Sequence, residues 1–555
     1  MTLPVPDSKS LYFVPLGGSG EIGMNLNLYG HAGKWLMVDL GITFADDTIP
    51  GVEVILPDPA AIEACQKDLA GIVITHAHED HIGAVGYLWP RLKCPVYTTP
   101  FAAEVLRGKL EEKEFGRKVP IRVVPVGGRF SVGPFDLEMI GLTHSIPEPT
   151  ALAIRTPAGT VLHTGDWKLD DTPLVGKVTD VDTLKKVGQE GVLAMVCDST
   201  NALVPGKSGS EDDVRRELLR LFPTLKNRIV VTCFATNVAR VTSIFEAAHR
   251  SGRQVALVGR SLWRLHEAAR ATGYIHDLPP PLEPADAAFL PRDRVVLVCT
   301  GSQGEPRAAL TRIAFDDHPE IVLEEGDTVI YSSREIPGNE KAIGRVQNAL
   351  SQLDVNIITS RDAAIHVSGH PARDELVQMY QWIRPQTAIP VHGEYRHQAE
   401  HARLAAECQV PHTIVPQNGS VVRLAPGKPE IVDTVPTGRL CLDGTRIVPL
   451  DWHSVRNRQR MMHSGAVVVS LVMNRKGKLM ADPQVSAMGL DGAEPEHDVM
   501  VRAARAATQA LDKLPSIIRE DDDTTVQEAV RVAVRRVFTD FQGKKPLTQV
   551  QIIRV

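Results

Sequence analysis

The stretch GIVITHAHEDHIG, residues 71–83, places three histidines and two carboxylates within six positions, just after an apolar run. Side chains two positions apart on an extended chain point to the same side, so His76 and His78 are expected to face one target. Asp80 and His81 follow where the chain turns toward a helix predicted to begin near Ile82. Burying such a cluster without partners is costly in free energy. The stretch therefore predicts a metal site at the end of a buried strand.

Three further side chains of the same kind follow short apolar runs elsewhere in the chain. His144 follows residues 139–142, Asp166 follows Val161 and Leu162, and His392 follows residues 389–391. Imidazole and carboxylate groups without thiolate suit Zn²⁺ or Mn²⁺. Seven such groups are too many for one four-coordinate ion, whereas two ions that share a carboxylate use all of them.

The composition is that of a globular protein with several domains. The chain has 555 residues, of which 43% are hydrophobic and 23% charged, and this length predicts two to four domains. We expect no transmembrane segment, because no apolar run approaches the length that crosses a bilayer. A formal net charge of −6 argues against a broadly basic nucleic-acid binder, although it is compatible with a local positive channel.

The cysteines and the N-terminus indicate the compartment. Seven cysteines are scattered without a CxxC pair, which is typical of free thiols in a reducing cytosol and speaks against disulfides and thiolate metal sites. The N-terminus lacks a basic region followed by an apolar core, so no secretory signal is expected. We therefore expect a cytoplasmic protein.

The pattern of apolar runs changes along the chain. Residues 11–170 read as short strands between Gly, Pro and Asp turns, whereas residues 211–350 alternate strand and helix, as in a parallel α/β unit. Residues 360–430 return to strands with His-rich loops, and residues 425–460 are rich in Pro and Gly. The tail predicts a strand, a turn and a second strand within residues 466–480, then helices over about 498–513 and 525–541 and a last strand at 550–555.

These motifs carry a resemblance to a known family. HxHxDH with later single His, Asp and His residues resembles the metallo-β-lactamase superfamily, and the parallel unit inserted after Asp166 resembles its β-CASP nuclease branch. Further motifs resemble the ribonuclease J family within that branch, nearly end to end: LGGSGEIGMN, DSTNA (198–202), CTGSQGEP (299–306), IPGNE (336–340) and HVSGH (366–370).

The resemblance implies an α/β fold: a metallo-β-lactamase αββα sandwich with an inserted parallel α/β β-CASP domain and a small C-terminal α/β module. The expected limits are 1–205 and 359–428 for the two parts of the metallo-β-lactamase core, 206–358 for the β-CASP domain, 429–460 for a linker and 461–555 for a C-terminal oligomerisation module. A homodimer or homotetramer is expected, with other RNA-decay proteins as further partners. The stripe Val526, Val530, Val534 and Val537 is compatible with an oligomer contact or with core packing inside the module.

By resemblance, two divalent ions are bound per chain, Zn²⁺ or alternatively Mn²⁺. His76, His78 and His144 would hold one ion, Asp80, His81 and His392 the other, with Asp166 bridging and Asp39 orienting the ligands. Asp80 and Asp166 would thus belong to the catalytic group, together with Asp198 and His370. His370, oriented by Asp198, is expected to give a proton to the departing 3′-oxygen or to bind phosphate only.

The resemblance further implies a 5′-to-3′ exoribonuclease that prefers 5′-monophosphate RNA, also cuts internally, and acts in mRNA decay and rRNA maturation. Its substrate is expected to be single-stranded near the 5′ end. The expected contacts of the terminal nucleotide are Ala235, Thr236, Asn237, His366, Val367, Ser368, Gly369 and His370. Thr236 and Asn237 also fit the N-cap of a helix.

Other readings remain open from the sequence. Arg260, Arg334, Arg373 and Arg396 are candidates for a basic RNA path, or solvated surface residues. A metallo-hydrolase of small esters or thioesters could use the same core, although it leaves the insert and HVSGH unexplained. A non-catalytic RNA-binding scaffold is a third possibility, and the presence of all seven ligand candidates argues against it.

Overall fold

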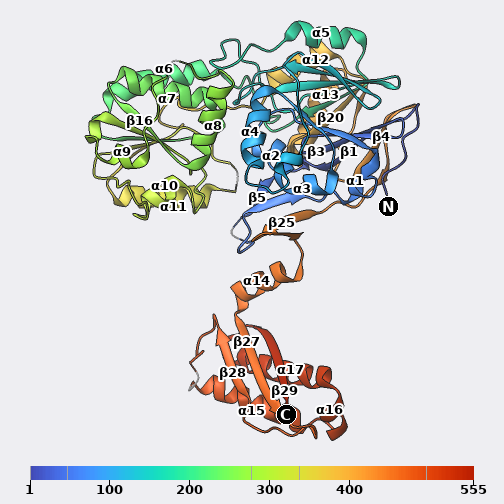
Figure 1. Cartoon of the computed structure of the whole chain (residues 1–555), viewed down its shortest axis with the longest axis vertical. Coiled ribbons are helices and arrows are strands. Elements are labelled where there is room, and N and C mark those ends of the chain that lie inside the picture. The colour runs from blue at the N-terminus through green and yellow to red at the C-terminus, as the bar shows by residue number, and fades with distance from the viewer. Residues whose placement is uncertain (1, 47, 277, 337, 495–496) are drawn as a thin grey trace. The chain divides into compact units, whose positions relative to one another are not determined.

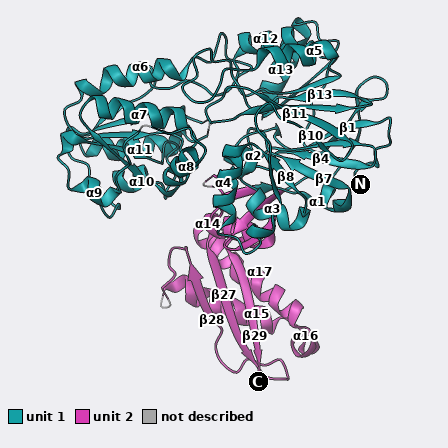
Figure 2. Ribbon diagram, turned by 45° about the horizontal axis from the view of Figure 1, so that its top comes forward, with its two compact units in different colours: residues 1–43, 56–438 teal, residues 44–55, 439–555 magenta. Residues whose placement is uncertain are grey.

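The computed structural model describes every residue except 1, 47, 277, 337 and 495–496, and it divides into two compact units. The first comprises Met1–Thr43 and Leu56–Gly438, and the second comprises Phe44–Ile55 and Arg439–Val555 (Figure 2). Each unit is described by itself. No helix in the described part of the chain has the length and apolar character needed to cross a bilayer.

The first unit is built on two large mixed sheets (Figure 1). One sheet has the strand order β24-β23-β1-β3-β4-β7-β8-β9. Its strands are β1 (Leu11–Gly17), β3 (Leu26–His31), β4 (Lys34–Val38), β7 (Leu69–Val73), β8 (Val96–Thr98), β9 (Ile121–Val123), β23 (Ser420–Ala425) and β24 (Glu430–Thr434). β4, β7, β8 and β9 run parallel, so the ends of β4 and β7 meet at one edge.

The other sheet has the order β10-β11-β12-β13-β14-β20-β22. Its strands are β10 (Arg129–Val132), β11 (Phe135–Gly141), β12 (Thr150–Thr156), β13 (Gly159–His163), β14 (Ala194–Asp198), β20 (Thr387–Val391) and β22 (His412–Thr413). β13, β14 and β20 are parallel, which brings their carboxyl ends together. β2 (Ser19–Gly20) and β21 (Gly393–Glu394) form a short parallel pair that joins the first residues of the chain to the segment after β20.

A single apolar core lies between these sheets. Leu36, Val38 and Val73 of the first sheet pack with Leu152 and Val196 of the second, and all five are almost fully buried. Helices cover the outer faces: α5 (Val181–Glu190), α12 (Arg373–Ile383) and α13 (Tyr395–Glu407) contribute buried side chains to the outer side of the second sheet. The short helices α1 (Ala60–Glu63), α2 (Glu79–Ile82), α3 (Val85–Leu92) and α4 (Pro100–Leu110) lie along the first sheet (Figure 1). This is the expected αββα sandwich.

Between β14 and β20 the chain forms a separate parallel sheet with the order β16-β17-β15-β18-β19. Its strands are β15 (Ile229–Thr232), β16 (Gln254–Val258), β17 (Val295–Cys299), β18 (Thr328–Tyr331) and β19 (Asn356–Ile358). Helices lie on its two faces (Figure 1): α6 (Glu211–Leu221), α7 (Val238–Arg250), α8 (Arg260–Ala271), α9 (Pro284–Ala288), α10 (Ala309–Ala314) and α11 (Glu340–Gln352). The continuous apolar strands follow from burial on both faces. Residues 305–308 form an irregular loop, and α10 begins at Ala309.

The second unit contains a small sheet, a linking helix and a three-stranded sheet covered by helices. The small sheet has the order β26-β25-β6-β5, and the other β28-β27-β29. The strands are β5 (Thr43–Phe44), β6 (Val54–Pro57), β25 (Arg439–Asp443), β26 (Arg446–Pro449), β27 (Ala466–Met473), β28 (Gln484–Met488) and β29 (Leu547–Arg554). The helices are α14 (His453–Ser464), α15 (Asp498–Asp512), α16 (Ser516–Asp521) and α17 (Asp523–Gln542).

Two details of this unit differ from the sequence expectation. Residues 429–460, expected as a linker, include β24 of the first unit and then β25, β26 and the first turns of α14, because Pro436, Gly438 and Gly444 lie between short strands. The predicted turn is present at Asn474–Gly477, and residues 478–480 return antiparallel to the end of β27, but they form only an isolated bridge and the second strand is Gln484–Met488. Val526, Val530 and Val534 are fully buried in the core that β27 and α15 also form, and Val537 packs against it partly buried, so core packing accounts for the valine stripe.

Candidate metal centre

The predicted ligands lie where neighbouring strands end, because parallel strands bring their carboxyl ends to one edge. His76 and His78 follow β7, and α2 begins one residue after His78 and carries Asp80 and His81. His144 follows β11, Asp166 follows β13 and His392 follows β20. The structure thus brings all seven predicted ligands together from segments up to 316 positions apart along the chain.

The first group consists of His76, His78, His144 and Asp166, whose ligand atoms lie within 4.8 Å of one another. Nδ1 of His78 lies 3.0 Å from Nε2 of His76 and 3.0 Å from Nε2 of His144. One ring N–H cannot serve two acceptors at once, whereas a cation among the three rings would satisfy all three lone pairs. The group therefore fits a metal ion.

The second group consists of Asp80, His81, Asp166 and His392. Nε2 of His392 lies 3.0 Å from Oδ2 of Asp80, and Nε2 of His81 lies 3.2 Å from Oδ2 of Asp166. Asp166 belongs to both groups, and its Oδ1 is buried without a hydrogen-bond partner among the described residues. An unpartnered buried carboxylate oxygen facing a histidine is what a second cation would satisfy.

Hydrogen bonds hold the far side of the His81, His392 and His144 rings and fix their orientation. Nδ1 of His81 lies 2.7 Å from Oδ2 of Asp39, which also accepts from the Thr75 hydroxyl. Nδ1 of His392 lies 2.8 Å from the Thr200 hydroxyl, and Nδ1 of His144 lies 2.5 Å from the carbonyl of Gly369. Such outer contacts set the tautomer and leave the opposite nitrogen free to bind a metal.

The protonation of the histidines differs between the two groups. Burial lowers the pKa of His76 and His144 well below the usual value, and that of His78 to about 4, so these rings are neutral at pH 7. Burial also lowers the pKa of His81 and His392, but the Asp166 carboxylate and its acidic neighbours outweigh it and hold both pKa values well above the usual range. The second group therefore carries excess negative charge that protons or a cation must offset.

Asp198 and His370 form a third group with Asp166 and His392. Nδ1 of His370 lies 2.8 Å from Oδ2 of Asp198 and 3.7 Å from Oδ2 of Asp166. Burial lowers the pKa of His370, but the Asp198 and Asp166 carboxylates outweigh it and raise that pKa above the usual value. A cationic His370 keeps a proton on Nε2, the nitrogen that points away from Asp198.

The HVSGH loop touches this centre directly. A Cβ at Gly369 would lie 2.7 Å from Cε1 of His144, so only glycine allows the loop to approach this closely. Ser368 Oγ accepts hydrogen bonds from Asn201 Nδ2 at 2.7 Å and from the His370 amide at 3.2 Å. His366 and Val367 precede it and are half-buried, and Nδ1 of His366 is buried without a hydrogen-bond partner among the described residues.

Residues 235–237, the second segment predicted to contact RNA, include one residue with a structural role. Asn237 is the N-cap of α7: its Oδ1 accepts from the Arg240 amide at 2.9 Å, and its Nδ2 donates to Glu211 at 3.0 Å. Both ends of this amide are therefore occupied within the protein, as the N-cap alternative predicts. Ala235 and Thr236 are half-buried beside it.

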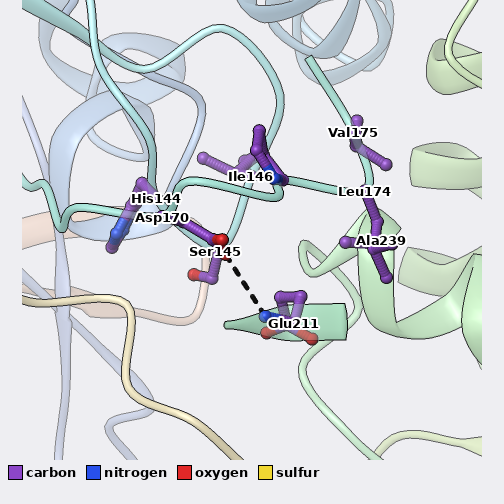
Figure 3. Close-up of a pocket in the computed structure, with 9 residues that line it drawn as sticks. His144, Ser145, Ile146, Asp170, Leu174, Val175, Glu211 and Ala239 are labelled. Carbon is purple, nitrogen blue, oxygen red and sulfur yellow. Dashed lines mark hydrogen bonds between the residues drawn. The ribbon is translucent and has the colours of Figure 1, made fainter. Parts of the chain in front are cut away.

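A pocket lies next to His144 (Figure 3). The Glu211 amide donates to Oδ2 of Asp170 across its floor at 3.2 Å. The lining residues are His144, Ser145, Ile146, Asp170, Pro173, Leu174, Val175, Glu211 and Ala239. Since His144 is among them, the pocket opens beside the first metal group.

Several supporting residues were not predicted. Thr200 and Asn201 follow Asp198 within the DSTNA motif, and Asn25, whose Nδ2 lies 3.2 Å from Nε2 of His81, follows the GGSGEIG glycines. Their position within recognised motifs was the available signal. Of the predicted basic residues, Arg373 and Arg396 are engaged in ion pairs with Glu400 and Glu394.

The chain was compared with known families and proteins. It matches the families described as "Metallo-beta-lactamase superfamily" over residues 24–229, "Ribonuclease J, beta-CASP domain" over 226–350, "Zn-dependent metallo-hydrolase RNA specificity domain" over 355–415 and "Ribonuclease J C-terminal domain" over 453–555. These matches confirm the predicted fold class.

Similar proteins cover the chain almost completely. It is 44% identical to ribonuclease J of Sinorhizobium meliloti over 99% of this chain and 98% of that protein. It is 36% identical to ribonuclease J of Mycobacterium tuberculosis over 100% of this chain and 99% of that protein. Among solved structures, a protein of unknown function from Enterococcus faecalis aligns with a TM-score of 0.54 at 19% identity, over 75% of this chain and 100% of that one, which supports the fold alone.

Proposed function

The chain belongs to the ribonuclease J family and is a metal-dependent ribonuclease, and from this premise we propose that it degrades RNA from the 5′ end, prefers a 5′-monophosphate and also cuts internally. The observation that carries the proposal is the contact between the HVSGH loop and the metal centre, with Gly369 against His144 and His370 against Asp198. A terminal nucleotide bound on this loop would place its phosphodiester bond beside the metal groups. The ester-hydrolase and non-catalytic readings are set aside by the family membership.

The ligand assignment is part of this proposal. His76, His78 and His144 would hold one divalent ion, Asp80, His81 and His392 the other, and Asp166 would bridge them, in agreement with the two groups of facing ligand atoms. Asp39 would orient His81. We propose Zn²⁺ or Mn²⁺, since both accept imidazole and carboxylate. When bound, such ions activate a water for attack on phosphorus and offset charge on the phosphoryl oxygens.

The protein side chains would supply the rest of the reaction. Asp198 holds Nδ1 of His370, so that Nε2 carries the proton that the departing 3′-oxygen needs. Ser368, held by Asn201, and the loop amides would bind the terminal phosphate. Val367, His366, Ala235 and Thr236 would line the nucleotide site, while Asn237 supports it as the N-cap of α7.

We propose that each domain has the role predicted from the sequence. Residues 1–205 and 359–428 would carry the metal centre, residues 206–358 the insert that binds RNA, and residues 461–555 an oligomerisation module. A homodimer or homotetramer acting in the cytoplasm on mRNA and rRNA precursors, together with other RNA-decay proteins, completes the proposal. Sedimentation of a chain that ends at residue 455 tests the module: an unchanged number of chains per particle would contradict its role.

The direct test uses one RNA sequence in three forms, 5′-monophosphate, 5′-triphosphate and circular. The chelator-stripped protein is supplied with Zn²⁺ or Mn²⁺, and products are followed in time. We expect mononucleotides first from the monophosphate form, slow release from the triphosphate form, and internal fragments from the circle. Equal rates from all three forms would contradict the preference for a 5′-monophosphate.

A further inference from the structure

Three loops meet at one edge of the inserted sheet, and the catalytic proposal uses only the one after β15. β17, β15 and β18 are adjacent and parallel, so the loops after Cys299, Thr232 and Tyr331 leave the sheet at the same edge. The connection from β17 to β18 crosses β15, and ligands of parallel sheets commonly bind at the carboxyl ends of the strands where the strand order reverses. CTGSQGEP is the loop after β17.

Gln303 of this motif holds the loop after β18. It is 5% exposed, its Nε2 donates to the carbonyl of Arg334 at 2.8 Å, and its Oε1 accepts from the Ile336 amide at 2.9 Å and from Nδ2 of Asn339 at 3.3 Å. Gly304 follows with a φ of +74°, and a Cβ there would lie 2.5 Å from the carbonyl carbon of Ala342 at the start of α11. The buried amide thus fixes the backbone that carries Arg334.

Asn201 then holds the Arg334 side chain. Nη1 of Arg334 donates to Oδ1 of Asn201 at 2.9 Å, and Nδ2 of the same amide donates to Ser368 Oγ at 2.7 Å and to the carbonyl of His370 at 3.0 Å. Asn201 is 2% exposed, so a single buried amide connects the guanidinium to the HVSGH loop. Burial and the Arg240 cation lower the pKa of His366 to about 3, and the Arg334 charge adds to this effect.

The guanidinium itself is available to a ligand. Arg334 is exposed. Within the described part of the chain, its side chain makes a hydrogen bond to Asn201 alone. The remaining N–H donors of a planar guanidinium match the oxygens of a phosphate group in pairs. Because the hydrogen bond to Asn201 already restricts the Arg334 side chain, binding a phosphate costs less side-chain entropy.

We propose that Arg334 is a specificity residue that binds the 5′-terminal phosphate of the RNA, and that Asn201 and Gln303 are the positioning residues that hold it beside the HVSGH loop. This inference rests on the proposed 5′-end preference. A terminal monophosphate carries more negative charge than an internal phosphodiester, so a cation at this position favours the RNA end over the middle of the strand. It also gives CTGSQGEP a role, which is to shape the loop that presents Arg334.

The test compares wild type, Arg334→Gln, Arg334→Lys, Gln303→Ala and the control Arg250→Gln. Arg250 is an exposed arginine on α7 whose ion pair with Glu246 lies on the helix surface. Binding is measured by fluorescence anisotropy with a 2′-O-methyl decamer that carries a 5′-monophosphate or a 5′-hydroxyl. KM and kcat are measured on the corresponding RNA with a 5′-monophosphate.

For Arg334→Gln we expect Kd and KM on the monophosphate end to rise about tenfold, the equivalent of one charged hydrogen bond, with kcat within about twofold. Binding of the 5′-hydroxyl decamer should not change. Arg334→Lys should recover part of the loss, Gln303→Ala should shift KM in the same direction, and Arg250→Gln should behave as wild type. A melting temperature equal to that of wild type is expected for Arg334→Gln, because the side chain is exposed.

Two outcomes would overturn the inference while leaving the proposed function intact. In the first, wild type prefers the monophosphate and Arg334→Gln keeps the same preference. In the second, Arg334→Gln weakens both decamers equally, which would make Arg334 a general backbone contact. A wild-type protein that does not distinguish the two ends would instead overturn the proposed function, and the inference with it.

Discussion

Asp39 accepts a hydrogen bond from Nδ1 of His81 at 2.7 Å while its other oxygen accepts from the Thr75 amide at 2.8 Å. The carboxylate is completely buried, at the end of β4, and it ties that strand to the histidine-rich turn after β7. Nε2 of His81 is thereby aimed at Asp166 and Asp80. The orientation of His81 within the second group therefore depends on a residue outside that group.

We expect Asp39→Asn to weaken metal binding by about 10–100-fold, because an amide orients His81 less firmly and lowers its basicity. Titrating the stripped protein with Mn²⁺ and following activity measures the change. Asp136→Asn, at an exposed position on β11, is the matched control and should bind as wild type does. An unaltered Mn²⁺ dependence in Asp39→Asn would show that the hydrogen bond to Asp39 does not orient the ligand.

The variant His370→Ala tests whether His370 donates a proton or only binds phosphate. If Nε2 protonates the departing 3′-oxygen, kcat should fall about 10²–10⁴-fold with KM nearly unchanged. A substrate with sulfur in place of the 3′-oxygen needs no proton on departure, so the variant should cleave it almost as fast as wild type does. An equal loss on both substrates, or a loss confined to KM, would leave His370 with phosphate binding only.

The buried ion pair of Glu211 and Arg240 should stabilise the insert in a pH-dependent way. Oε1 of Glu211 lies 2.9 Å from Nη2 of Arg240, and both side chains are almost fully buried. Burial raises the pKa of Glu211, but Arg240 outweighs it and holds the pKa below the usual 4.5. Because the folded-state pKa is depressed, the contribution is complete above about pH 4.5 and is lost as the pH falls further.

Glu211→Gln should therefore lower the free energy of unfolding by about 3–5 kcal/mol at pH 7, since it leaves a buried guanidinium without its charge partner. The difference from wild type should shrink as the pH is lowered below about 4.5. Urea denaturation at several pH values measures it. Glu217→Gln, which removes an exposed pair with Arg220, should cost under about 1 kcal/mol at every pH. A pH-independent difference for Glu211→Gln would exclude the ion pair as its cause.

Metal binding should stabilise the protein and release protons. His81 and His392 carry protons at pH 7 without a metal, because the nearby carboxylates outweigh burial and raise their pKa values. A metal ligand must be deprotonated, so both protons should leave on binding. Calorimetric titration with Zn²⁺ in two buffers of different ionisation enthalpy counts them, and the melting temperature should rise with metal. Asp166→Ala should reduce both effects, and heats that are the same in both buffers would contradict the prediction.

The sequence predicts the candidate ligands because each one follows a short apolar run, and strand ends are a local pattern. His76 to His81 needed no partner from elsewhere to be recognised. The contacts that orient the rings cannot be predicted in this way, because the partners are distant in the sequence. Thr200 contacts His392, 192 positions away, and Asn25 contacts His81, 56 positions away. A hydroxyl or an amide carries no local mark of such a contact. For the same reason the sequence does not reveal that Gln303 supports Arg334.

The division of the fold shows a similar limit. The sequence does not show that Phe44–Ile55 belong to the second unit, where β6 pairs with β25. Their apolar content is too small to predict a partner so far along the chain. The linker was predicted from its Pro and Gly residues. These residues indicate turns, but they do not distinguish a flexible linker from a series of short strands.

That second unit also sets an order of events during synthesis. Its first strands, β5 and β6, leave the ribosome before the sheet partner β25, which begins at Arg439. At 5–20 residues per second the wait is roughly 20–80 s, long enough for the inserted parallel sheet, whose last strand is β19, to fold first. During this time β5 and β6 have only each other as partners, and the edge of β6 that later pairs with β25 stays open. A nascent chain halted before residue 439 therefore presents an open edge at this point, where chaperones or a second nascent chain would meet it.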